Sequence, residues 1–307
     1  PDLSQPLRWM SLTILPMSIL TLEGQSLKGL KKITDSILLQ GVLVPLLVLL
    51  FIFPLVSLSG IIGVTWAYLI ASIFVGFYGW IRWKRITFSI KKSNFAFNST
   101  TLLESCKFLY PVALINRAVI PWFPILFLGI WVSPDDTGIF GVASRVSMLV
   151  SFLLTTLNNV VAPIFSELYT KGKLDKMAKT ARSSAMIITI LSIPVFLPLI
   201  LFSEIVMSLF GAEFERGGKV LLILAIGQLT NTFCGSVGFL LNMSGNERAN
   251  SKVTLISLIV LIVSMVLLIP PFGIIGAAIA SSASVITFNI LAFYQAERKI
   301  GIKLRWI

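Results

Sequence analysis

Long apolar runs alternate with short charged or Gly/Pro-containing segments along the whole chain. Several runs exceed the ~18 residues that mark a transmembrane helix. We therefore predict nine transmembrane helices, at residues 7–27, 33–57, 60–81, 105–131, 137–165, 183–210, 217–241, 251–269 and 273–295. The pattern indicates an all-α protein that crosses a membrane many times.

Composition agrees with this interpretation and excludes several kinds of chemistry. Hydrophobic residues make up 56% of the 307 residues and charged residues 12%, about half the share found in soluble proteins. The chain has no histidine, which excludes histidine-ligated metals, Ser-His-Asp catalysis and histidine proton relays. Cys106 and Cys234 lie far apart in separate apolar segments, so they form neither a disulfide framework nor a zinc site.

Enzymatic function is not expected, and neither a cofactor nor a metal ion is predicted. The chain has no GxxxxGK[ST] phosphate loop, so it carries no ATP-driven motor. The adjacent acids Asp135 and Asp136 fall in a turn before a helix, where they are typical of a helix cap. No pair of carboxylates is placed to act as acid and base at membrane depth.

The basic residues between the predicted helices predict the orientation of the chain. Nineteen of the 25 Lys and Arg residues lie in alternate connections and in the C-terminal tail, against three on the opposite side. By the positive-inside rule the basic side is cytoplasmic, which predicts a multi-pass protein of the cell membrane with a cytoplasmic C-terminus. The net charge of +12 is thus a topology signal that also suits contact with anionic membrane lipids, and no nucleic-acid partner is predicted.

An internal repeat is predicted from two copies of one short sequence. Gly-Ile-Ile-Gly occurs at 60–63 and at 273–276, each time at the start of an apolar helix that ends in a basic cluster. At the same offset Ala67 matches Ala280 and Arg85 matches Arg298. These matches predict two six-helix repeats in parallel orientation, as in a two-lobed transporter of twelve helices.

The repeat predicts a domain organisation in which the first copy is incomplete. Residues 1–86 would form the second half of an N-terminal lobe, with its first three helices expected before Pro1. We expect a basic cytoplasmic linker at 87–104, a six-helix C-terminal lobe at 105–300 and a cytoplasmic tail at 301–307.

Two arginines inside predicted helices are the strongest candidates for a binding site. A charge inside a membrane costs on the order of 2.5–3.5 kcal/mol on insertion scales. Arg117, beside Asn116, lies about ten residues (~15 Å) into its helix, and Arg145 lies about two turns into the next. Prolines that bend the first of these helices lie at 111, 121 and 124. The arginines are predicted to form a cationic cavity for an anionic substrate such as a phosphate; the alternatives are an interhelical ion pair or snorkelling to the surface.

Three further polar side chains are weaker candidates. Glu23, near the cytoplasmic end of helix 7–27, is a possible site for a coupling ion or proton, or an interfacial hydrogen-bonding group. Gln228 and Asn231, midway along helix 217–241, either line the substrate path or join neighbouring helices by hydrogen bonds.

Four segments resemble motifs of a known transporter superfamily. Gly138–Arg145 is similar to the GxYxxAxR-type start of an eighth helix, and Leu241–Gly245 to an L-N-x-[ST]-G turn after a tenth. Ala162–Leu168 and Pro271–Ala280 resemble the end of the eighth helix and the connection between the last two. Together they resemble the polysaccharide transporter branch of the multidrug/oligosaccharidyl-lipid/polysaccharide exporter superfamily, over essentially the whole chain.

The resemblance implies a function and partners. It implies a flippase that moves a lipid-linked oligosaccharide, carried on an isoprenoid pyrophosphate, from the cytoplasmic to the outer leaflet for surface polysaccharide synthesis. Its implied partners are this lipid-linked substrate, membrane lipids and a polysaccharide polymerase or glycosyltransferase complex. The polyanionic headgroup is what Arg117 and Arg145 would attract.

Two other interpretations stay open, and so does the energy source. A drug or organic-cation antiporter of the same superfamily would require acids and aromatic rings in its cavity. A non-transporting accessory subunit of a glycan-synthesis complex is the third possibility. Many relatives carry an Asp near the position of Pro121 and Trp122, which is absent here, so proton, sodium and substrate gradients all remain candidates.

Overall fold

A computed structural model describes residues 4–30, 32–88 and 99–304, and these residues form helices joined by short turns. The chain divides into two compact units, Pro1–Ala96 (unit 1) and Phe97–Ile307 (unit 2). The division falls within the predicted linker 87–104, of which residues 89–98 lie outside the described part. Helices continue into both ends of that linker, since α5 ends at Phe88 and α6 begins at Ser99.

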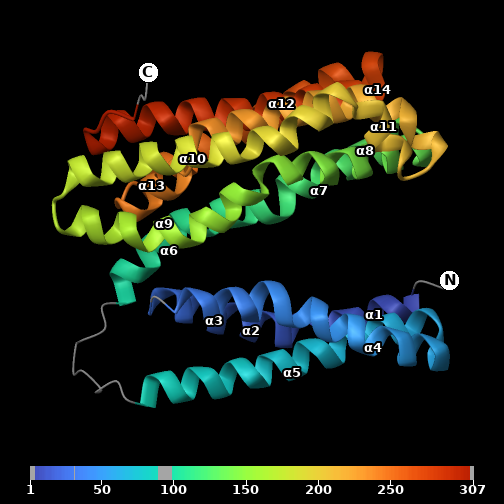
Figure 1. The fold of residues 1–307 in the computed structure, drawn as a ribbon, viewed down its shortest axis with the longest axis horizontal. Helices are drawn as coiled ribbons and strands as arrows, with labels where there is room; N and C mark the ends of the chain where they lie inside the picture. Colours follow the sequence, from blue (N-terminus) through green and yellow to red (C-terminus); the bar gives the residue numbers. More distant parts are fainter. Residues whose placement is uncertain (1–3, 31, 89–98, 305–307) are drawn as a thin grey trace. The chain divides into compact units, whose positions relative to one another are not determined.

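Unit 1 consists of five α-helices and one π-helical turn in its described part (Figure 1). They are α1 (Ser4–Leu12), α2 (Ile14–Gly29), α3 (Ile33–Ile37), the π-turn η1 (Leu38–Val42), α4 (Leu43–Ser59) and α5 (Ile61–Phe88). The core of this unit is small and is formed by Leu20, Leu27, Leu39, Val44 and Val75.

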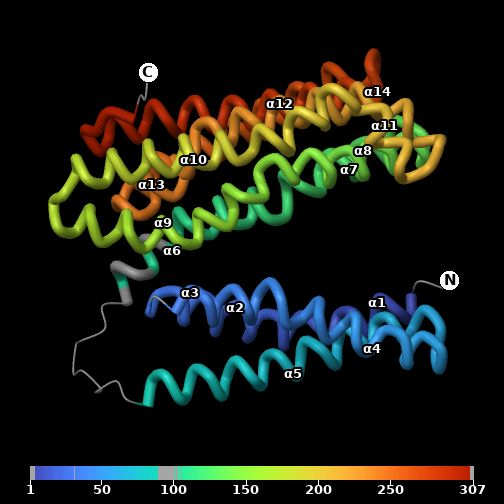
Figure 2. The backbone as a smooth tube through the Cα atoms, viewed as in Figure 1, coloured from blue at the N-terminus to red at the C-terminus, as the bar shows by residue number. Residues whose placement is uncertain are grey.

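Unit 2 is the larger unit, and Figure 2 shows its long helices running side by side. Its elements are α6 (Ser99–Leu114), the π-turn η2 (Ile115–Val119), α7 (Ile120–Trp131), α8 (Pro134–Ser147), η3 (Met148–Ser151), α9 (Phe152–Thr170), α10 (Leu174–Leu201), α11 (Ser203–Ser208), η4 (Ala212–Gly217), α12 (Gly218–Cys234), α13 (Val237–Met243) and α14 (Glu247–Ile300).

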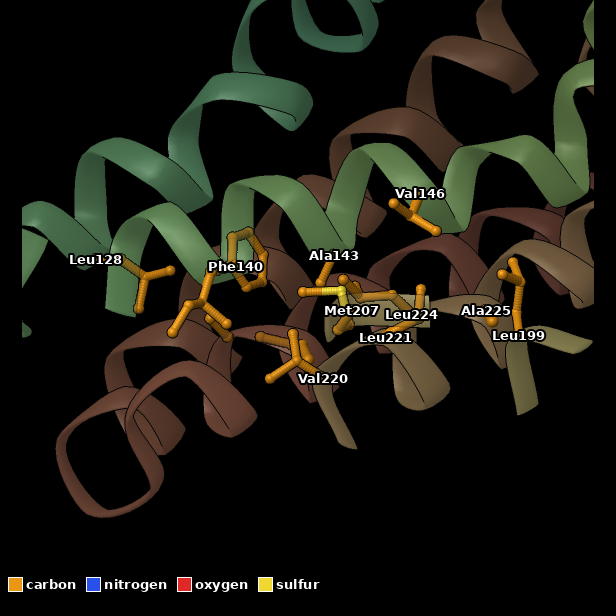
Figure 3. Close-up of a cluster of buried hydrophobic side chains, with 14 of the residues drawn as sticks. Leu128, Phe140, Ala143, Val146, Leu199, Met207, Val220, Leu221, Leu224 and Ala225 are labelled. Carbon is orange, nitrogen blue, oxygen red and sulfur yellow. The ribbon is translucent and has the colours of Figure 1, made fainter. Parts of the chain in front are cut away.

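The core of unit 2 joins helices that are far apart in the sequence. Phe140 on α8, Met207 on α11 and Leu221 on α12 are fully buried in one cluster (Figure 3). Small residues of α14, including Ala277 and Ala280, complete this cluster and allow close helix contact. Such close packing matters in a membrane, where lipid tails remove most of the hydrophobic drive for helix association.

Seven helical segments are long and apolar enough to cross a membrane, among the residues that the structure describes. They are Ile33–Ser59, Ile61–Phe88, Cys106–Trp131, Pro134–Thr170, Leu174–Leu201, Ala212–Cys234 and Glu247–Ile300. The sequence predicted nine spans.

Two features account for the difference from nine. The predicted helices 251–269 and 273–295 are both present, but they meet directly at Gly273, where the backbone leaves the helical conformation and the chain turns back, so the 54-residue element α14 counts once although it contains both. The predicted helix 7–27 is divided at Thr13 into α1 and α2, each too short to span alone. Pro16 has no N–H to donate to the carbonyl of Leu12, which favours a break at this point.

The repeated Gly-Ile-Ile-Gly sequence forms the same tight reversal in both units. Gly60 has φ 57° and ψ −134°, and Gly273 has φ 53° and ψ −130°, a conformation open almost only to glycine. Three residues later the new helix passes very close to the one before it. A Cβ on Gly63 of α5 would collide with the carbonyl oxygen of Leu55 on α4. A Cβ on Gly276 would collide with the carbonyl of Leu268 in the same way.

The start of the predicted tail 301–307 packs onto unit 2. Gly301 ends α14 in a left-handed conformation, and Ile302 and Leu304 are buried in a second core cluster. The backbone N–H of Leu304 donates to Oε1 of Glu297 at 2.8 Å. Residues 305–307 lie outside the described part.

Candidate functional site

The π-turn η2 carries the predicted site residues Asn116 and Arg117. Pro121 lacks an N–H and its ring would crowd the carbonyl of Arg117, so a regular α-helix cannot continue here. The helix instead forms one wider, π-helical turn, in which the N–H of Ile120 donates to the carbonyl of Ile115, five residues earlier. Such π-bulges are frequent at functional sites.

Arg117 lies near the middle of a predicted membrane span. The span Cys106–Trp131 places it 11 residues from one end and 14 from the other, about 17 and 21 Å along the helix. The side chains of both Arg117 and Asn116 are exposed on unit 2. In the described parts of the chain no carboxylate pairs with Arg117, so the predicted alternative of an ion pair finds no support.

Arg145 is also exposed, on α8. Because α8 begins at Pro134, Arg145 lies 11 residues (~17 Å) from its start, one turn deeper than the sequence predicted. One of the two acids at this end of the helix is already engaged. Asp136 donates its N–H to the Ser133 hydroxyl and forms an ion pair with Arg216 at 3.3 Å, so it acts as part of a cap.

Gln228 lines a small cavity inside unit 2, with a volume of about 70 Å³. Hydroxyls from two other elements line it as well, including Ser144 on α8 and Ser281 on α14. The buried Ser281 hydroxyl has no hydrogen-bond partner among the described residues. The cavity has room for a few water molecules but not for a glycan.

The structure does not gather all the predicted residues of unit 2 at this cavity. Pro121, four residues after Arg117, and Ser144, next to Arg145, line it, whereas the two arginines themselves do not. Asn231, half-buried one turn further along α12, is also outside its lining. The serine hydroxyls were missed because serine in an apolar helix is common and carries no distinctive sequence signal.

Glu23 lies in unit 1, in a cavity of about 670 Å³ between α1, α2 and α5. Its side chain is 9% exposed, and its Oε2 has no hydrogen-bond partner within the described residues. The carboxylate lies against Gly79 of α5, where a Cβ would occupy its space. The rest of the cavity wall is apolar and aromatic, with Leu15, Leu69, Ile73, Phe77 and Trp80 among its residues.

Polar residues beside Glu23 are engaged with one another. Gln25 donates to Oε1 of Gln40 at 3.2 Å, and Gln40 donates to the carbonyl of Thr21 at 3.4 Å. Asp35 of α3 and Arg82 of α5 form a close ion pair at 2.6 Å. These contacts leave the Glu23 carboxylate as the charged group of an otherwise apolar cavity lining.

Comparisons with known proteins agree on one family. The MatE family model matches residues 112–291. The probable low-salt glycan biosynthesis flippase Agl15 of Haloferax volcanii is 25% identical over 241 residues, which cover 78% of this chain and 51% of that protein. The probable flippase AglR of the same organism is 29% identical over 181 residues, covering 58% of this chain and 38% of that protein. The chain thus spans about half the length, or less, of these relatives.

A solved structure shares the fold of the chain over nearly its whole length. The MATE transporter VcmN of Vibrio cholerae in its bent form superposes with a TM-score of 0.73, covering 96% of this chain and 70% of that one. The sequence identity is 14%, so this likeness concerns the fold alone.

Proposed function

Because the chain belongs to the MatE family of membrane transporters, we propose that it forms part of a flippase for a lipid-linked oligosaccharide. Members of this family are transporters and not enzymes. The substrate would be an isoprenoid pyrophosphate sugar that moves from the cytoplasmic to the outer leaflet of the cell membrane for surface polysaccharide synthesis. Two relatives named as probable flippases support this choice of substrate.

The observation that carries the proposal is the position of Arg117. A guanidinium in the middle of a span, exposed on its unit and without a carboxylate partner among the described residues, needs water or an anion to offset its charge. A diphosphate headgroup supplies that anion and accepts paired hydrogen bonds from guanidinium. Arg145 and Asn116 would add donors to the same path, while Gln228 and Asn231 would support it from α12.

The mechanism would be alternating access. Two six-helix lobes would rock about a central path, shielding the sugar-phosphate headgroup while the lipid tail stays in the bilayer. The matching glycine reversals at 60 and 273 support the proposed repeat behind this twelve-helix arrangement. The partner complex would be the polymerase or glycosyltransferases that use the flipped product.

The test is the leaflet distribution of lipid-linked oligosaccharides in cells that lack the full-length gene. A membrane-impermeant glycan-modifying enzyme reports which leaflet carries them. We expect accumulation on the cytoplasmic side, restored by the wild-type gene and by Lys107→Ala, which removes a cation from the same helix near its end. Arg117→Ala should fail to restore flipping although the protein reaches the membrane, and Arg117→Lys should restore part of it. Normal flipping with Arg117→Ala would disprove the role of this arginine.

A drug or organic-cation antiporter is the second candidate, and the cavity at Glu23 favours it. A buried carboxylate beside Phe77 and Trp80 is the environment that attracts an organic cation. Under this alternative, cells without the gene would keep a normal leaflet distribution and become sensitive to cationic dyes.

A further inference from the structure

The fold brings together four cations from the two ends of α14. Because α14 reverses direction at Gly273, its start and its end lie at the same end of unit 2, as the returning red helix in Figure 1 shows. Arg248 and Lys252 come from the start, and Arg298 and Lys299 from the end. About fifty residues separate the two pairs in the sequence, so no sequence motif indicates that they meet.

These four side chains line one cavity of about 620 Å³, here named the basic cavity. Its wall also includes Gln295 of α14, whose amide can donate a hydrogen bond, and Phe108 of α6. The Arg248 guanidinium lies over the ring of Phe108, 4.8 Å from its centroid. This stacking limits the freedom of the guanidinium and leaves its N–H groups available at the edge.

The lining of the basic cavity carries more positive than negative charge. Two acids, Glu104 and Glu247, share the lining, but no ion pair joins them to the four cations in the described residues. Elsewhere in unit 2 exposed cations do find partners, as Lys171 does with Glu167 at 2.7 Å. The positive-inside rule explains why this end of the protein is basic. It does not explain why four cations converge on a hollow large enough for a ligand.

We propose that the basic cavity binds a phosphate or diphosphate ester. Guanidinium and ammonium groups are the usual partners of phosphate oxygens, and the lining, with four cations and two acids, carries a net positive charge that suits a phosphate or diphosphate. The volume lies within the range of small-molecule sites and leaves room for a group attached to the phosphates. The ligand would come either from a lipid headgroup or from a soluble phosphate compound.

If the ligand is the lipid-linked sugar, the basic cavity would capture it before transport. This part of the proposal rests on the proposed function and on the predicted cytoplasmic position of the basic side. The proposal that the basic cavity binds a phosphate ester depends on neither of these points. The binding site and the proposed function can therefore fail separately.

The test measures binding of inorganic pyrophosphate and of farnesyl diphosphate to the purified full-length protein in detergent by calorimetry. The double variant Arg298→Ala/Lys299→Ala should weaken binding about tenfold or more, because charge-assisted hydrogen bonds are lost. The matched control Lys176→Ala/Lys179→Ala removes two exposed cations of α10 that lie outside the cavity lining, and it should bind as wild type. The charge-conserving variant Arg298→Lys/Lys299→Arg should retain most of the binding, which excludes simple misfolding.

Each outcome decides a separate point. Equal losses in the two alanine double variants, or no measurable binding of either probe, would overturn the proposal. A selective loss in the cavity variant supports it, and tighter binding of farnesyl diphosphate than of pyrophosphate assigns the ligand to a lipid headgroup. Binding that survives while the leaflet test shows no flipping defect would keep the site and reject the proposed function.

Discussion

Arg117 and Glu23 are both charged residues in apolar helices, and their surroundings differ. The Arg117 side chain is exposed on unit 2. The Glu23 carboxylate is buried in an apolar cavity with one oxygen unpartnered. A buried carboxylate without a partner carries a desolvation penalty as an anion, which binding a proton or a cation would remove.

We expect Glu23→Gln to uncouple transport from a proton gradient. The amide keeps the shape of the side chain but cannot exchange a proton. The other charged groups on the helices packed around it would not replace this role. Asp35 and Arg82 are paired with each other, and Arg8, Lys84 and Arg85 are exposed cations. Flipping in proteoliposomes should lose its stimulation by a pH gradient and keep its rate without one.

The control for this experiment is Glu204→Gln, the same change at an exposed acid of α11. This variant should respond to the gradient as wild type does. An unchanged response in Glu23→Gln would remove Glu23 from the coupling mechanism.

Helices in this chain are interrupted where a proline or a glycine makes a regular helix impossible. Pro121 follows the π-turn that carries Arg117, and Gly273 allows α14 to reverse without a loop. Both interruptions shape a proposed site. The first changes the helix at the candidate anion site, and the second brings the two ends of α14 to the basic cavity.

Substituting the glycines of the second reversal should destabilise unit 2. Gly273→Ala forces a Cβ into a positive-φ conformation, at a cost of roughly 1–2 kcal/mol. Gly276→Ala places a methyl group against the carbonyl of Leu268, and overpacking of this kind costs about 1–3 kcal/mol. Thermal unfolding of the purified protein in detergent should show a lower melting temperature for each.

Gly129→Ala is the matched control, because a Cβ at this helical position meets no neighbouring atom. Its melting temperature should equal or exceed that of wild type. Wild-type stability of Gly276→Ala would show that the close approach of the two helix segments is not required.

Across the whole molecule, basic and acidic residues are distributed unevenly among the connections between helices. Within unit 2, the turn at Gly172 between α9 and α10 lies among basic residues, and the start of α8 at Asp135 is acidic. Each is exposed and open to chemical labelling. The positive-inside rule places the first in the cytoplasm and the second outside.

Cysteine labelling checks this orientation. Cys106 and Cys234 are free thiols and are first replaced by serine and alanine. In this background, an impermeant maleimide should label Asp135→Cys in intact cells, and should label Thr170→Cys, at the exposed end of α9 beside this turn, only after permeabilisation. The opposite pattern would invert the predicted topology and move the basic cavity to the outer face.

Much of the fold was predictable because its signals are local. Apolar length identifies a membrane helix without knowledge of its neighbours, and most predicted spans coincide with helices of the structure. The Gly-Ile-Ile-Gly repeat was visible as a pattern, and the structure added the reason for each glycine. The two predicted helices on either side of Gly273 are both present in α14, whereas the predicted helix 7–27 was wrong at Thr13, where the backbone breaks it into α1 and α2.

The candidate site was only partly predictable, because burial and convergence depend on packing between distant segments. The sequence by itself determined that the chain is a multi-pass membrane protein, that it is basic on one side, and that Arg117 and Glu23 are unusual in their helices. Only the tertiary structure decided that Arg117 is exposed while Glu23 is buried, that Ser281 and Gln228 line one small cavity, and that both ends of α14 line the basic cavity. Periodicity and charge are properties of one helix, whereas a site is made where several helices meet.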